Sequence, residues 1–321
     1  MKMGIVGATG EVGRTMIKVL EERGHDFEEL RLFSSKRSAG TKLSFNSKII
    51  KAEELTGKSM EEGFDYLLFS AGKDVSRKFA PIAAKHGSTV IDNSSAFRMD
   101  PDIPLVVPEI NADVLKDYHG IVANPNCSTI QLVLALNPLH AVYKLKHVVV
   151  TTMQAVSGSG RKGINELKDE ITKSSDPVVY PRKIAYNCVP QIGAFRENGF
   201  SEEEMKMINE TRKIMNCTCV VDATTVRVPV IYGHSESVYA EFERKFSLNE
   251  VIKVLNKAPS IKVWKDYPTA IEVFGIDLSH VGRLRISNDG KALMFWNVAD
   301  NVRVGAATNA VKILEYFLRN D

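Results

Sequence analysis

The residue with the clearest chemical potential is Cys127, which lies in residues 123–129 (ANPNCST). A short strand-like run precedes this segment, and a helical pattern from Ile130 to Leu139 follows it. A thiol at the start of a helix lies near unpaired backbone N–H groups and the positive end of the helix dipole, and both favour the thiolate. We therefore expect Cys127 to be a nucleophile, whereas Cys188, Cys217 and Cys219 have no comparable setting.

Two further residues could act on a substrate. His234 follows Gly233 at a predicted strand end, and an imidazole with its ordinary pKa of about 6.5 can move protons near neutrality. Arg227 alternates with the valines of its strand, so its side chain leaves the opposite face and could clasp a carboxylate through two parallel hydrogen bonds. The alternatives are a structural histidine and a surface salt bridge.

The chain opens with a glycine loop, residues 5–13 (IVGATGEVG), between a strand and an amphipathic helix. Glycines permit a tight turn and let backbone N–H groups approach a diphosphate at the helix start. The pattern is G-x-x-G-x-x-G, which alone is a weak signal, but its position favours a dinucleotide site over a plain turn. The predicted contacts are Gly7, Thr9, Gly10, Glu11 and Val12.

The end of the second predicted strand indicates which dinucleotide is bound. NAD-preferring sites place a carboxylate there for the ribose 2′-hydroxyl. Here residues 33–38 read FSSKRS, with no carboxylate and two cations. We therefore predict NADP, held by Ser35, Arg37 and Ser38, with an ordinary solvated basic turn as the alternative.

The elements around these motifs predict an α/β chain of two domains. Up to about residue 126 apolar strands alternate with helices, which is typical of a Rossmann-like, doubly wound parallel sheet. Long strands with few helices between them then indicate an α+β catalytic and dimerisation domain with a mostly antiparallel sheet. We place the NADP-binding domain at 1–126 and 302–321, the latter range carrying a terminal helix, and the second domain at 127–301.

Composition excludes several classes of protein. The 321 residues are 44% hydrophobic and 25% charged with a net charge of +3 and dispersed cations, which argues against nucleic-acid or membrane partners. No C-x-x-C pair or His/Cys cluster has zinc spacing, so we expect neither metal nor disulfides. No apolar run reaches the roughly 18 residues of a membrane span, and we expect a cytoplasmic protein without a signal peptide.

Five segments together carry a resemblance to a known family. The glycine loop, residues 93–98 (NSSAFR), 124–129 (NPNCST), 154–160 (QAVSGSG) and 227–237 (RVPVIYGHSES) occur in the order seen in aspartate-β-semialdehyde dehydrogenases, and the likeness extends from end to end. The resemblance implies reduction of L-aspartyl-4-phosphate by NADPH to L-aspartate 4-semialdehyde and phosphate, towards lysine, methionine, threonine and isoleucine. An acyl phosphate lets a thiolate expel phosphate and form a thioester that readily accepts hydride.

The resemblance also implies roles for individual residues. Cys127 would be the nucleophile, His234 the general acid and base, and Gln154 a hydrogen-bond donor that orients the substrate near Cys127. The other implied contacts are Arg227 for the substrate α-carboxylate, Glu203 for its ammonium, Lys206 with Arg98 for phosphate, and Ser157, Gly158 and Asn301 for the nicotinamide end of NADP. Without the resemblance, Glu203 and Lys206 would be a solvated ion pair on a helix that Ser201 and Glu204 cap.

Three alternative functions remain at this stage. An N-acetyl-glutamyl-phosphate reductase shares the thioester chemistry, but its acylated nitrogen would leave Glu203 without a cationic partner. A glyceraldehyde-3-phosphate dehydrogenase would prefer NAD and carry a different cysteine segment. A non-catalytic NADP-binding sensor of the same fold would not need Cys127, Gln154, Arg227 and His234 together. As partners we expect only the small-molecule substrate and further copies of the chain, in a homodimer or homotetramer.

Overall fold

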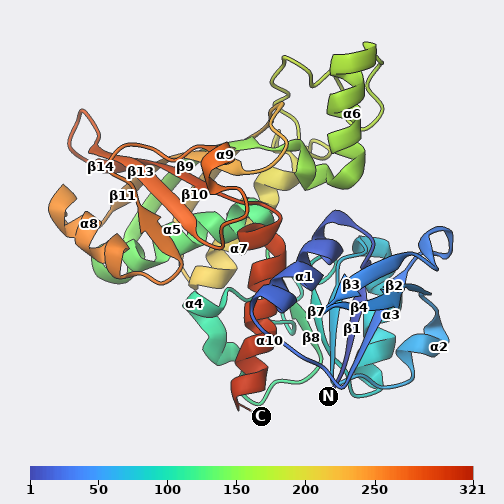
Figure 1. Ribbon diagram of the computed structural model, residues 1–321. Coiled ribbons are helices and arrows are strands. Elements are labelled where there is room, and N and C mark those ends of the chain that lie inside the picture. Colours follow the sequence, from blue (N-terminus) through green and yellow to red (C-terminus); the bar gives the residue numbers. More distant parts are fainter. Residues whose placement is uncertain (321) are drawn as a thin grey trace. The chain divides into compact units, whose positions relative to one another are not determined.

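The computed structural model describes residues 1–320, which form two compact units (Figure 1). Unit 1 contains Met1–Pro125 and the described residues from Ala306 onward, and unit 2 contains Asn126–Gly305. The chain therefore leaves the first unit immediately before Cys127 and returns to it through the helix at its C-terminus.

Unit 1 is built on a six-stranded sheet in which every pair is parallel. The strand order is β5-β2-β1-β6-β7-β8, so the order reverses beside β1, where doubly wound sheets bind their ligands. The predicted Rossmann-like sheet is confirmed. Its strands are β1 (Lys2–Val6), β2 (Glu29–Ser34), β5 (Glu53–Glu54), β6 (Tyr66–Phe69), β7 (Thr89–Asp92) and β8 (Ile121–Ala123).

Helices connect and cover these strands. The apolar face of α1 packs against the terminal helix α10 and the sheet in one core cluster. A small hairpin of β3 and β4 was not predicted; each of its strands has only four residues. The remaining elements of unit 1 are α1 (Glu11–Glu22), η1 (Lys36–Ser38), β3 (Lys42–Phe45), β4 (Lys48–Lys51), α2 (Gly57–Met60), α3 (Lys73–Lys85), α4 (Pro108–Asn111), η2 (Ala112–Leu115) and α10 (Thr308–Asn320).

Unit 2 contains a second six-stranded sheet of order β10-β9-β11-β14-β13-β12. The central pairs are antiparallel as predicted, but β9 with β10 and β12 with β13 are parallel, so the sheet is mixed. A parallel pair requires a long crossover, which helices α6 and α7 supply between β9 and β10. The strands are β9 (Leu145–Gln154), β10 (Val220–Arg227), β11 (His234–Phe242), β12 (Ile261–Val263), β13 (Ser279–Ile286) and β14 (Ala292–Ala299).

One face of this sheet is covered by α5, whose first two-thirds are buried almost all round. Since α5 lies against strands β9, β11, β13 and β14, its first residue is held over the sheet. In Figure 1, α8 and α6 lie at opposite ends of unit 2. The elements are α5 (Cys127–Tyr143), η3 (Val156–Ser159), α6 (Gly160–Lys173), α7 (Glu202–Met215), α8 (Leu248–Lys257), α9 (Ala270–Val273) and the π-helix η4 (Arg303–Ala307), which crosses the unit boundary.

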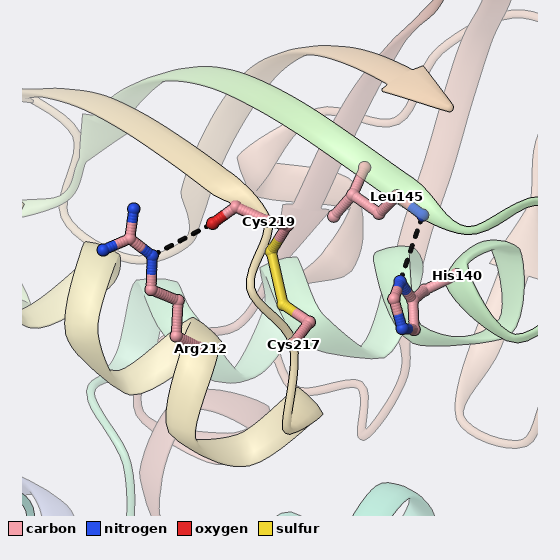
Figure 2. Close-up of a disulfide and its surroundings, with 5 residues drawn as sticks. All are labelled: His140, Leu145, Arg212, Cys217 and Cys219. Atoms are coloured by element: carbon pink, nitrogen blue, oxygen red, sulfur yellow. Dashed lines mark hydrogen bonds between the residues drawn. A yellow bond between two sulfur atoms is a disulfide. The ribbon is translucent and has the colours of Figure 1, made fainter. Parts of the chain in front are cut away.

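The end of α7 corrects one expectation. Cys217 and Cys219 form a disulfide, so the prediction that the chain has none is wrong (Figure 2). Asn216 ends the helix in the left-handed conformation with φ of 45°, and the turn that follows leaves the two cysteine Cα atoms 5.4 Å apart. That separation lies within the usual range for disulfides. A search for C-x-x-C spacing does not detect this C-x-C pair.

Among residues 1–320, no helix has both the length and the apolar character needed to cross a membrane.

Candidate active site

Three of the predicted site residues meet at one end of the unit 2 sheet. Gln154 is the last residue of β9 and pairs in register with Arg227, the last residue of the parallel strand β10. The antiparallel strand β11 begins at this same end with His234, which pairs with Ala299 at the end of β14. Strand order therefore brings together residues from three separate parts of the sequence.

Cys127 is the first residue of α5, as predicted. Asn126 caps the helix, and its side-chain oxygen accepts hydrogen bonds from the N–H groups of Ser128 and Thr129. Gly305 packs against the cysteine so closely that a Cβ there would lie 2.7 Å from the Cys127 Cβ. Cys127 is thus held from both sides at the helix terminus, where a thiolate is electrostatically favoured.

His234 contacts the cysteine directly. Its Nε2 lies 3.2 Å from the Cys127 Sγ, and the backbone N–H of Ala155 donates to its Nδ1 at 3.0 Å. Because Nδ1 accepts that bond, the proton of a neutral ring must be on Nε2. The imidazole therefore directs an N–H group at the sulfur.

The surroundings of His234 keep it neutral. Complete burial, and secondarily the positive charge of Arg227, lower the pKa of His234 to about 3. The ring is therefore a neutral hydrogen-bond donor at physiological pH rather than an imidazolium.

Arg227 is 4% exposed, so it does not form the surface salt bridge that was the alternative interpretation. Its Nη1 donates to the backbone oxygen of Ala155 at 2.6 Å, and its guanidinium lies 5.8 Å from the ring centroid of Tyr180. The Nε is buried without a hydrogen-bond acceptor within residues 1–320. A buried donor in this state is costly unless a ligand such as a carboxylate completes it.

A pocket of about 440 Å³ opens beside Arg227. It is lined by Ser159, Tyr180, Gln191 and residues 192–194. Gly158 gives the arginine its place, since a Cβ at this glycine would lie 2.8 Å from the Arg227 Nη1 and 3.4 Å from the His234 ring. Tyr180 and Gln191 were not predicted, because no local motif marks them.

Glu203 is the centre of a buried hydrogen-bonded cluster. Its Oε1 accepts from the side-chain amides of Asn126 at 2.8 Å and Gln154 at 3.1 Å, and its Oε2 pairs with the Lys206 Nζ at 3.0 Å. Burial alone would raise the pKa of Glu203, but Lys206 and these hydrogen bonds together lower it to about 2. The carboxylate of Glu203 is therefore a buried anion that contacts Asn126, the residue before Cys127.

Sequence reasoning missed Glu210, which lies two helical turns after Glu203 on α7. Its Oε2 accepts from the backbone N–H of Asn126 at 2.6 Å, and the residue is 1% exposed. Asn126 is consequently held by two carboxylates from the same helix. An asparagine just before a helical pattern is a cap signal, but nothing local indicates its acceptor 84 residues later.

Ser157 and Asn301 are also brought together in unit 2. Two side-chain hydrogen bonds, of 3.2 and 2.9 Å, join them, and the Asn301 Oδ1 accepts from the N–H of Gly233 at 2.8 Å. These contacts fix the chain immediately before His234. The capping box predicted for Ser201 and Glu204 at the start of α7 is confirmed.

The glycine loop of unit 1 joins β1 to α1. Gly7 has φ of +82°, and its N–H and that of Ala8 both donate to the Phe33 oxygen on β2. A Cβ on Gly13 would lie 2.3 Å from the Gly7 oxygen, so only glycine permits this approach of helix to strand. Thr9 and Gly10 complete the turn before the unpaired N–H groups of the helix.

The predicted 2′-phosphate residues follow β2 in the short helix η1 and the residue before it. Ser35 and Arg37 are exposed and Ser38 is half-buried. Arg98, also in unit 1, is 7% exposed, and it donates its Nε to the Asn124 oxygen at 2.9 Å and its Nη2 to the Asn93 oxygen at 2.8 Å. These bonds to main-chain oxygens fix the orientation of the guanidinium. Residues 1–320 contain no cluster of His, Cys, Asp and Glu that could hold a metal.

The low pKa of His234 predicts how stability depends on pH. His234 binds a proton less readily in the folded protein than in the unfolded chain. Its contribution to the free energy of unfolding is therefore complete above pH 6.5 and is lost as the pH falls towards 3. Between pH 7 and pH 5, the wild type should lose about 2 kcal/mol of unfolding free energy that the His234→Gln variant does not lose. Urea denaturation at both pH values measures this, with the exposed His86→Gln as control. An equal loss in both variants would contradict a neutral, buried His234.

Comparisons with known proteins agree with this arrangement. Residues 2–118 match the family model "Semialdehyde dehydrogenase, NAD binding domain", and residues 136–304 match "Semialdehyde dehydrogenase, dimerisation domain". The aspartate-semialdehyde dehydrogenase of Aquifex aeolicus is 48% identical over 99% of this chain and 98% of its own, and that of Bacillus subtilis is 46% identical over 98% and 96%.

A solved structure supports the same conclusion. The crystal structure of aspartate semialdehyde dehydrogenase II from Vibrio cholerae, complexed with ASA, is 42% identical, covers 99% of this chain and 98% of its own, and has a TM-score of 0.96. The residues that meet in unit 2 and the comparisons over the full length lead to one assignment: the chain belongs to the aspartate-semialdehyde dehydrogenase family.

Proposed function

We propose that this protein reduces L-aspartyl-4-phosphate with NADPH to L-aspartate 4-semialdehyde and phosphate, through a thioester on Cys127. The observation that carries the proposal is the 3.2 Å contact between the Cys127 Sγ at the start of α5 and the Nε2 of a neutral His234. Such a pair can present a nucleophilic sulfur and stabilise negative charge beside it.

The covalent steps follow from this geometry. The Cys127 sulfur forms a bond to the acyl carbon, the bond from that carbon to the phosphate oxygen breaks, and phosphate leaves. NADPH, when bound, supplies the hydride that reduces the thioester. The carbon–sulfur bond then breaks, which releases the aldehyde and restores the thiolate. The N–H group on the His234 Nε2 hydrogen-bonds the sulfur and can donate to the oxygen that carries negative charge in both tetrahedral intermediates.

The polar residues of unit 2 suit an amino acid with an activated side chain. Arg227 offers an unpaired Nε for the α-carboxylate, and the anionic Glu203 attracts the α-ammonium. Gln154, hydrogen-bonded to Glu203, orients the substrate beside the nucleophile. We assign the leaving phosphate to Lys206 and to Arg98 of unit 1.

The cofactor site fits a dinucleotide. The loop requires glycine at residues 7 and 13 and leaves backbone N–H groups at the start of α1 uncovered by side chains. Thr9, Gly10, Glu11 and Val12 would contact the diphosphate, and Ser35, Arg37 and Ser38 a 2′-phosphate. Ser157, Gly158 and Asn301 would face the nicotinamide. A homologue from Candida albicans, 24% identical, is described with NADP.

The alternatives receive less support. The curated relatives named above are aspartate-semialdehyde dehydrogenases over nearly their full lengths, which does not favour an N-acetyl-glutamyl-phosphate reductase. A non-catalytic sensor would have no need for the buried Arg227 and Glu203 around Cys127. We place the enzyme in the cytoplasm, because Cys127 must remain reduced to act.

We propose a homodimer formed by unit 2, with a homotetramer as the larger alternative. The matched family model is a dimerisation domain, and the face of the sheet opposite α5 carries several apolar side chains that are not fully buried. Its side chains are half-buried or exposed and include Val149, Thr151, Met153, Tyr239, Met294 and Trp296.

The requirement for phosphate tests the reaction. With L-aspartate 4-semialdehyde and NADP as substrates, NADPH formation should need inorganic phosphate and should fall at least about 1,000-fold in Cys127→Ala, since the covalent route is lost. Absorbance of NADPH measures this, with Cys188→Ala as control because that cysteine is exposed and unassigned. Turnover without phosphate would refute the acyl-phosphate assignment, and an active alanine variant would place the nucleophile elsewhere.

Arg227 provides a test of substrate recognition. The Arg227→Lys variant keeps the charge but cannot make two parallel hydrogen bonds to a carboxylate, so kcat/KM should fall about 100-fold, or roughly 2.7 kcal/mol. Steady-state kinetics with Arg244→Lys as control, an exposed arginine two residues beyond the end of β11, isolates the effect. A loss of less than about threefold would exclude the two-point contact.

Cofactor preference tests Ser35, Arg37 and Ser38. The kcat/KM for NADPH should exceed that for NADH, and Arg37→Ala should reduce the ratio about tenfold, because one cation next to the 2′-phosphate is removed. The exposed Lys48→Ala on β4 is the matched control. If the wild type prefers NADH, the assignment of these residues is wrong.

A further inference from the structure

A buried acid behind the catalytic pair has no role in the reaction described above. Glu236 lies on β11 two residues after His234, on the face of the sheet that α5 covers, and it is 0% exposed. We propose that Glu236 is a positioning residue that, as a neutral acid and together with Asn297 and Gln131, holds His234 in place against Cys127. This inference rests on the proposed thiol chemistry of Cys127.

The connection starts from the helix. Gln131 is one turn after Cys127 on α5, and residues four apart share a helix face. The Cys127 sulfur contacts the His234 ring, while the Gln131 Nε2 donates to the His234 backbone oxygen at 3.3 Å. Both the ring and the main chain of the histidine are therefore tied to the same side of α5.

Asn297 joins this helix to the strand. Its Nδ2 donates to the backbone oxygen of Gln131 at 3.0 Å and to the Glu236 Oε2 at 2.9 Å, and its Oδ1 accepts from Ser279 at 2.7 Å. All four side chains are 0% exposed. An amide fixed at both ends in this way locks the register between α5, β11 and β14.

The remaining polar atoms lack a hydrogen-bond donor. Within the described chain, the Glu236 Oε1 and the Gln131 Oε1 are both buried without a partner, and both are acceptors. A proton on the carboxyl group would turn one of these two acceptors into a donor, which relieves the mismatch of two buried acceptors. Burial likewise raises the pKa of Glu236 to about 8, despite the hydrogen bonds from Asn297 and Gln131 that favour the ionised form.

No neighbouring charge offsets the preference of the Glu236 carboxyl group for its neutral form. Three groups face Glu236 from neighbouring elements: Asn297 on β14, Gln131 on α5, and Thr152 on β9, which pairs in register with Glu236. None of them titrates. On its own strand, His234 is neutral above its pKa of about 3. Above pH 8 the carboxyl group would therefore lose its proton and become a buried anion with no cation beside it.

Kinetics as a function of pH test the proposal. The wild-type kcat should fall above about pH 8, whereas Glu236→Gln, which mimics a neutral acid, should keep kcat within about threefold at pH 7 and lack this alkaline decline. Glu241→Gln, the same change at the other end of β11, is the control and should follow the wild type. Coinciding profiles for wild type and Glu236→Gln would overturn the proposal.

Two further measurements do not depend on turnover. At pH 7, an infrared band of a protonated carboxylic acid should be present in wild type and Glu241→Gln and missing in Glu236→Gln; its presence in all three would show that Glu236 is ionised and would overturn the proposal. The rate of Cys127 alkylation by iodoacetamide should change above about pH 8 in wild type and Glu241→Gln but not in Glu236→Gln; the same profile in all three would overturn the proposal. If the phosphate and Cys127→Ala experiments failed, the reaction would be wrong, yet these two readouts would still decide the state of Glu236.

A variant without polar atoms separates positioning from packing. Glu236→Leu should lower kcat at least about tenfold while KM for the semialdehyde stays within about threefold, because Arg227 and Glu203 are untouched. An unchanged kcat would contradict a positioning role. If this variant does not fold, the glutamine variant and its infrared band still give the answer.

Discussion

The contact between the Cys127 sulfur and the His234 ring is the interaction on which the rest of unit 2 depends. A helix start favours the thiolate form of a cysteine, and a hydrogen-bond donor beside the sulfur stabilises its negative charge further. A neutral imidazole with its proton on Nε2 is such a donor, and burial keeps it neutral. The distance between the Cys127 Sγ and the His234 Nε2 depends on the relative positions of helix α5, strand β11 and the main chain at Ala155.

The charged groups around Cys127 and His234 are each held by hydrogen bonds within unit 2. Glu203 is anionic and already hydrogen-bonded, Arg227 is anchored to a main-chain oxygen, and Asn126 is held by Glu203 and Glu210. Fixed dipoles and charges need not reorganise as charge moves in the reaction, which is the main source of electrostatic catalysis. The cost is a buried cluster in which loss of one partner leaves another unsatisfied.

Sequence patterns predicted the elements better than the contacts. The parallel sheet of unit 1 follows from apolar strands such as Tyr66–Phe69, whose residues are all buried, because only a sheet covered on both faces tolerates them. Cys127 was identifiable from its place at a helix start, whereas His234 was expected at a strand end and is instead the first residue of β11. Glu236 was not, because alternation in β11 shows which face it occupies but not that Asn297, 61 residues later, supplies its partner. The disulfide between Cys217 and Cys219 was missed for a different reason, because it joins cysteines only two residues apart through a local turn that C-x-x-C spacing does not describe.

The bond from the Ala155 N–H to the His234 Nδ1 has a consequence for how this enzyme can vary. The group that selects the tautomer belongs to the main chain, and every residue except proline would supply it. Ala155 is fully buried, so the size of the side chain limits which residues can replace it, whereas the hydrogen bond to His234 does not depend on the side chain. The tautomer of His234 therefore depends on a main-chain N–H group, which most point substitutions at residue 155 would leave in place.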